Sequence, residues 1–195
     1  MHKGFNSKIL FFVLVSIFLV FLVGSFFSID SNSKDLNPAT PILASLEKEK
    51  IIPLRIKIPS IGVDAPIKPV GLTKQNSMEA PDKPMETAWF KLGASPGQKG
   101  SSVIAGHRGW RVGPAIFDNL YKIKIDDKVY VEDEHGETRA FVVRKMQVYE
   151  ANELVPEVWN KIDAAYLNLI TCSGKWNILT GTSDKRLVVF TELVI

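Results

Sequence analysis

The sequence has little of the residue chemistry that marks several common classes of protein. Its 195 residues contain a single cysteine, Cys172, so no disulfide can form within the chain. The 24 Lys and Arg residues nearly balance the 21 Asp and Glu residues and form no basic run, so we expect no nucleic-acid partner. The absence of an internal repeat excludes solenoids and propellers. We predict no cofactor and assign no metal ligands, and the sequence leaves a metal requirement open.

One long stretch, residues 9–27, contains no charged side chain. As a helix it would cross the roughly 30 Å hydrocarbon core of a bilayer. It is longer than the core of most signal peptides, about 7–15 residues, although cleavage remains the alternative. Lysines precede it and Asp30 follows it, which predicts a cytoplasmic N-terminus. We therefore predict a cytoplasmic stub and transmembrane signal anchor at 1–29, an extracellular linker at 30–50 and one folded domain outside the cell membrane at 51–195.

The folded part reads mainly as short β-strands. Leu54, Ile56 and Ile58 alternate with basic residues at the two-residue period of a half-buried strand. Five further runs have β character and are bounded by turn residues: Ser101–Ala105, Lys128–Glu132, Thr138–Tyr149, Tyr166–Cys172 and Arg186–Val194. Short helices are predicted at Ala115–Tyr121 and Asn152–Asp163. The pattern favours an all-β dominated domain that forms a closed or nearly closed barrel.

Cys172 stands at the end of the apolar run AYLNLITC, before Ser173 and Gly174, so we expect it where a strand gives way to a loop. A thiol has an ordinary pKa of about 8.5 and needs a cationic neighbour to act as a nucleophile near neutral pH. His107 is the candidate partner, because it follows a predicted strand in VIAGHRGW. The competing interpretation is a small buried cysteine and a structural histidine.

Arg186 opens the run RLVVFTELVI, which reads as the strand next to the cysteine strand if residues 182–185 close the loop between them. A fixed cation there would stabilise the negative charge that develops on a carbonyl oxygen during acyl transfer. The alternative is a surface arginine that pairs with Asp184 or Glu192.

Three short segments together resemble the sortase signature: AGH at 105–107, LITC at 169–172 and RLVV at 186–189. They occur in the order and with the Cys-to-Arg spacing typical of that family, and the similarity extends over most of residues 52–195. Asn168 departs from the usual T-L-x-T-C pattern. The chain contains no D-P-aromatic lid motif, so it looks closer to single-domain sortases of class F or D.

The resemblance implies an eight-stranded sortase-like β-barrel with short helices. It also implies that Cys172 attacks the Thr–Gly bond of an LPXTG-like sorting signal and passes the acyl group to an amine of a cell-wall precursor. By matching position, His107 becomes the proton-transfer partner and Arg186 the oxyanion stabiliser. Thr171 looks like the threonine that contacts the substrate in this family.

Two tryptophans stand in loops near the cysteine, Trp159 in 149–163 and Trp176 in 173–185, and would help to wall a peptide groove. Packing of both rings in the core or at the rim is the alternative. Other functions also stay open. The chain could be a thiol peptidase that hydrolyses the same acyl-enzyme, or a non-catalytic membrane-anchored binding barrel with a buried Cys172. An L,D-transpeptidase ranks last, because the S-H-G-C-like motif of those enzymes is absent.

Overall fold

The computed structural model describes residues 50–109, 113–178 and 181–194, all within one compact unit, Glu49–Ile195. The predicted signal anchor and nearly all of the predicted linker lie outside the described residues. Within the described ranges, no helix has the length and apolar character needed to cross a membrane.

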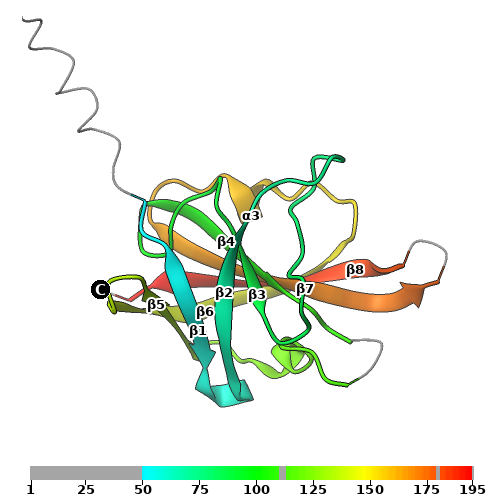
Figure 1. Ribbon diagram of the computed structural model, residues 1–195, viewed down its shortest axis with the longest axis horizontal. Helices are drawn as coiled ribbons and strands as arrows, with labels where there is room; N and C mark the ends of the chain where they lie inside the picture. Colours follow the sequence, from blue (N-terminus) through cyan, green and yellow to red (C-terminus); the bar gives the residue numbers. More distant parts are fainter. Residues whose placement is uncertain (1–49, 110–112, 179–180, 195) are drawn as a thin grey trace, which may run out of the picture. The chain divides into compact units, whose positions relative to one another are not determined.

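The described residues form a closed barrel in the order β1-β2-β3-β4-β7-β8-β6-β5, in which β1 pairs with β5 to complete the circle (Figure 1). The all-β prediction of an eight-stranded barrel is therefore confirmed. Its strands are β1 Pro53–Ile58, β2 Val63–Val70, β3 Thr87–Phe90, β4 Gly100–Gly106, β5 Lys128–Asp133, β6 Thr138–Glu150, β7 Ala165–Asn177 and β8 Thr182–Leu193. In the part of the chain that the structure describes, helical structure is limited to the 3-10 turns η1 Pro59–Ile61 and η2 Leu120–Lys122 and the short helix α3 Pro156–Trp159.

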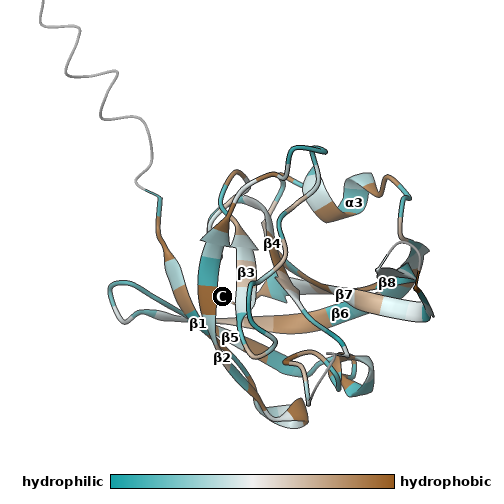
Figure 2. Ribbon diagram, turned by 45° about the vertical axis from the view of Figure 1, so that its right-hand side comes forward, coloured by the Kyte–Doolittle hydropathy of each residue, from teal (hydrophilic) through white to brown (hydrophobic). Residues whose placement is uncertain are grey.

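The two faces of the barrel wall carry different apolar clusters. Every strand contributes to the larger cluster, as Ile56 does from β1 and Leu169 from β7, so this cluster fills the barrel. A smaller cluster contains Val103, Val158 and Val188, which belong to β4, α3 and β8. Because side chains alternate along a strand, Val103 and Val188 lie on the outer face of the wall. The helix α3, which lies outside the barrel (Figure 2), contributes Val158 to the same cluster.

The observed elements differ from the sequence prediction in several ways. The predicted helix at Ala115–Tyr121 is wrong, since turns and η2 occupy that stretch, and only α3 forms within Asn152–Asp163. The observed strands include β2 and β3, which the periodicity did not single out. Finally, residues 182–185 belong to β8 instead of a loop.

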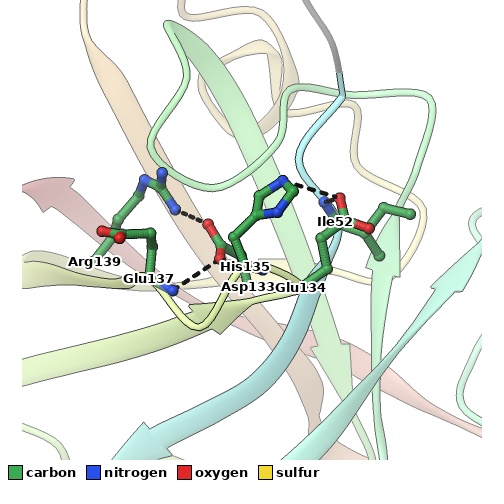
Figure 3. Close-up of polar contacts among 6 residues, drawn as sticks. All are labelled: Ile52, Asp133, Glu134, His135, Glu137 and Arg139. Carbon is green, nitrogen blue, oxygen red and sulfur yellow. Dashed lines mark hydrogen bonds and ion pairs between the residues drawn. The ribbon is translucent and has the colours of Figure 1, made fainter.

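A buried carboxylate organises the turn between β5 and β6. Asp133 is only 3% exposed, and its Oδ1 accepts hydrogen bonds of 3.0 Å from both the His135 and Glu137 backbone N–H groups. Its Oδ2 pairs with the Arg139 guanidinium (Figure 3). Next to this turn, Glu134 accepts a 3.0 Å hydrogen bond from the Ile52 backbone N–H, which fastens the start of the domain to the hairpin. The turn therefore supports the end of the barrel where the domain begins.

Replacing Asp133 with alanine should destabilise the domain more at neutral pH than at acidic pH. Burial raises the pKa of Asp133, but the hydrogen bonds from Arg139, His135 and Glu137 lower it more, so the net pKa is below its ordinary value. The carboxylate therefore stabilises the fold above its unfolded pKa of about 3.9, and this stability is lost as pH falls through the folded pKa. We expect a loss of about 3 kcal/mol in the free energy of unfolding at pH 7.

Urea titrations at several pH values measure this difference. Asp64→Ala is the matched control, because Asp64 forms an exposed ion pair of 2.6 Å with Arg55 and its loss should matter much less. Equal effects of the two substitutions at pH 7 would contradict the role given to Asp133.

Candidate active site

Three adjacent strands, β4, β7 and β8, bring the predicted site residues together. Cys172 on β7 lies directly opposite Arg186 on β8. In the parallel β4–β7 ladder, Ala105 pairs with Ile170, and His107 and Cys172 each follow two residues later. The three side chains therefore come to the same stretch of the barrel wall, although His107 and Cys172 are 65 positions apart in the sequence.

All three residues line one open pocket on the outer face of the wall. Cys172 is partly exposed, and so are His107 and Arg186. The floor of the pocket beside the cysteine is apolar. Ile170 lies two residues before Cys172 on β7, and Val188 lies two residues after Arg186 on β8. The alternative of a thiol sealed in the core is therefore wrong.

Cys172 does not stand at a strand end, as the sequence suggested, because β7 continues to Asn177. The Ser–Gly pair after the cysteine forms a bulge instead of a loop, with a register shift between Ser173 and Trp176. Gly174 adopts a φ of +75°, and a Cβ there would collide with the Asp184 carboxylate. That carboxylate accepts a 2.7 Å hydrogen bond from the Lys175 backbone N–H and so holds the bulge in place.

The backbone at His107 is held from both sides. The hydroxyl of Thr171, a residue only 2% exposed, donates a 2.8 Å hydrogen bond to the Gly106 carbonyl. The His107 carbonyl accepts a 2.9 Å bond from the Phe117 N–H, and the Phe117 ring fills the space that a Cβ on Gly106 would need. Thr171 lines the pocket, but its hydroxyl is engaged within the protein. Contact between Thr171 and substrate remains a prediction.

The imidazole of His107 has a fixed contact that sequence patterns do not indicate. Its Nε2 lies 2.7 Å from the carbonyl oxygen of Pro81, a buried residue in the segment between β2 and β3. A carbonyl only accepts, so Nε2 carries the proton in this contact. Asp118 holds the chain after His107, because its carboxylate accepts hydrogen bonds from the backbone N–H groups of Gly109, at 2.7 Å, and Ala115, at 2.9 Å.

Arg186 makes no pair with Asp184 or Glu192, so the surface-pair alternative is wrong. Glu192 pairs with Arg144, and the Asp184 carboxylate is taken by the β7 bulge. The Arg186 guanidinium instead lies back along its own strand. There it donates to the Ser183 carbonyl at 2.7 Å, the Lys185 carbonyl at 2.8 Å and the Thr182 hydroxyl at 2.9 Å.

The two tryptophans also line the pocket. Trp159, at the end of α3, is 40% exposed and packs edge-on against Phe90 with ring centroids 5.5 Å apart. Trp176 is 61% exposed on the β7–β8 hairpin, which extends past the rest of the barrel in orange and red in Figure 1. Their binding of substrate remains a prediction. In the described part of the chain, no three His, Cys, Asp or Glu side chains gather as metal ligands.

An eight-stranded barrel that gathers a partly exposed thiol, an imidazole and a guanidinium in one pocket has the groups needed for thiol-based acyl transfer. The sortase domain matches residues 56–194, and the chain therefore belongs to the sortase family. Members of this family are cysteine transpeptidases. None of the curated proteins compared with the chain matches it significantly.

Solved sortases share the fold. Sortase C-1 of Actinomyces oris is 25% identical with a TM-score of 0.60, and the match covers 83% of this chain and 84% of that one. Sortase C2 of group B Streptococcus pilus island 1 is 28% identical with a TM-score of 0.57, covering 78% of each chain. Sortase A of Corynebacterium diphtheriae is 24% identical with a TM-score of 0.58, covering 84% and 71%. The predicted class F or D assignment remains a prediction.

Proposed function

We propose that this sortase cleaves an LPXTG-like sorting signal between Thr and Gly and transfers the new acyl end to a cell-wall amine. The observation that carries the proposal is that Cys172 on β7, Arg186 opposite it on β8 and His107 just after the end of β4 all line one pocket. A nucleophile flanked by a proton-transfer group and a fixed cation is the set that acyl transfer through a thioester requires.

In the proposed cycle, the Cys172 thiolate adds to the carbonyl carbon of the substrate threonine. The negative charge then moves to the carbonyl oxygen, which Arg186 stabilises. As the carbon–nitrogen bond breaks, protonated His107 gives its proton to the leaving glycine amine, and a thioester remains. An incoming amine then attacks the thioester, neutral His107 accepts its proton, and the Cys172 thiolate leaves.

The apolar part of the pocket supports a substrate with an apolar residue near the scissile bond. Ile170, Val188 and Val155 line the pocket beside Cys172, and the exposed Trp159 and Trp176 stand at its rim. Burying a leucine-sized side chain there contributes about 1.5–3 kcal/mol to binding. An extended peptide can place such a residue a few positions before the attacked carbonyl, as the leucine of LPXTG does.

We place the enzyme at the cell membrane as a single-pass protein with its catalytic domain outside. The uncharged segment 9–27 and the charges on either side of it support this location. The proposed partners are secreted proteins that carry the sorting signal, and an amine acceptor from a peptidoglycan precursor. A thiol peptidase would use the same acyl-enzyme but release it to water.

A peptide library based on LPXTG tests the proposal. The full-length protein, kept in detergent micelles, is incubated with the library, with and without an added amine such as triglycine. Mass spectrometry should show cleavage after threonine, and amine addition should convert the acid product into the amide-linked product. Cleavage that yields only the acid at every amine concentration would assign a peptidase, and no cleavage of any member would reject the proposal.

A further inference from the structure

In the ranges that the structure describes, Arg186 donates hydrogen bonds only to neutral acceptors. Its three partners are two backbone carbonyls, of Ser183 and Lys185, and the hydroxyl of Thr182. Among the described residues, every ion pair involves other cations, and none includes Arg186. Neutral acceptors orient a guanidinium without cancelling its charge, whereas a carboxylate would do both. The full positive charge therefore remains available to an oxyanion.

The Arg186 guanidinium has N–H donors left over that can bind that oxyanion. A guanidinium has five N–H donors. Both protons of Nη1 are directed to carbonyls, and one proton of Nη2 is directed to the Thr182 hydroxyl. The Nε–H and the second Nη2–H have no acceptor among the described residues. These two donors can therefore bind a substrate carbonyl oxygen while the other three hold the group in place.

Of the three groups that accept hydrogen bonds from Arg186, only the Thr182 hydroxyl belongs to a side chain. Thr182 is the first residue of β8 and pairs with Asn177, the last pair of the β7–β8 ladder before the hairpin turn and the one next to the Trp176–Ser183 pair. The two carbonyl contacts restrain Nη1 alone. The third contact holds Nη2, the nitrogen that carries one of the two remaining donors, so Thr182 helps to set the direction in which those donors point.

We propose that Thr182 is a positioning residue that aims the Arg186 guanidinium at the oxyanion of the acyl-transfer reaction. The proposal rests on the function proposed above, because it assigns to Arg186 the oxyanion of that reaction. Loss of one hydrogen bond that orients the guanidinium should lower kcat about 2- to 10-fold. KM should change little, because the oxyanion exists only in the transition state.

The test compares Thr182→Val, which keeps the shape and removes the acceptor, with Thr182→Ser, which keeps the acceptor. Thr182→Ala removes the acceptor without a branched side chain and guards against a packing effect of valine. We expect kcat for peptide cleavage to fall 2- to 10-fold in the Val and Ala variants and to stay near wild type in the Ser variant. Thermal melting of each variant verifies folding.

A double substitution separates positioning from a general structural role. In an Arg186→Ala background, Thr182→Val should cause no further loss, because the group that Thr182 aims is absent. Three results would overturn the inference, provided that the wild type cleaves the peptide. They are a kcat of Thr182→Val equal to wild type, equal losses of kcat in the Val and Ser variants, and a further loss of kcat in the Arg186→Ala background. Failure of the wild type to cleave any peptide would instead reject the proposed function and the inference with it.

Discussion

Cys172→Ala should lose all detectable peptide cleavage and all transfer to an amine. The pocket that holds His107 and Arg186 contains this one thiol, and the described chain offers no second cysteine to replace it. General acid–base help and oxyanion stabilisation act on an attack that the thiol begins, so removing the thiol leaves them nothing to assist. Mass spectrometry of the intact protein after incubation with peptide measures the acyl-enzyme directly, and the variant should show none.

Ser173→Ala is the matched control for this substitution. Ser173 is the next residue on β7 and does not line the pocket, so its replacement should leave cleavage and acylation close to wild type. A neutral alkylating reagent should block the wild type and add one adduct to it, and should add none to Cys172→Ala. Turnover by Cys172→Ala above the background of a no-enzyme sample would contradict the proposed mechanism.

Strand periodicity was enough to predict most of the barrel, because alternation directly reports which face of a strand is buried. Ile56 and Ile58 are fully buried and Lys57 between them is exposed, as the sequence predicted. The prediction that Leu54 shares the buried face is wrong: its side chain is 49% exposed, because the β1–β5 register shifts between Pro53 and Arg55. β2 was missed because Pro66 and Pro69 interrupt it, and prolines normally argue against a strand. β3 has four residues, too few for a period to stand out.

The error at Cys172 has a specific physical cause. A Ser–Gly pair after an apolar run usually marks a turn, but here Gly174 absorbs a bulge and the strand continues. The partner that makes this possible is the carboxylate of Asp184 on the opposite strand. A contact between strands cannot be read from the local sequence of either one.

In the candidate active site, too, the sequence predicted some residues and missed others. Cys172, His107 and Arg186 were predicted because their residue types carry chemistry and their segments resemble a known signature. Pro81 and Thr182 left no such signal. Pro81 acts through its backbone carbonyl, which every residue has, and Thr182 acts through a contact that exists only once Arg186 folds back along β8. Supporting contacts of this kind arise only in the folded chain and leave no pattern in the sequence.

His107→Ala should lower kcat/KM for peptide cleavage by about 10² to 10⁴-fold, the usual contribution of a positioned acid–base group. The structure supports a large value, because the imidazole is held at Nε2 by the Pro81 carbonyl and its backbone is held by Phe117. A group fixed in this way contributes fully to proton transfer, since little ordering is needed during the reaction. Initial rates with the preferred library peptide measure the loss.

His135→Ala is the control, because His135 lies in the exposed β5–β6 turn and outside the pocket, and its rates should match wild type. Free imidazole supplies a second check. The space left by His107→Ala opens on a solvent-accessible pocket, so added imidazole should restore part of the lost rate, and it should not activate Cys172→Ala. A His107→Ala variant with kcat/KM within about twofold of wild type would be far from the expected loss. That result would show that His107 is not the proton donor to the leaving amine.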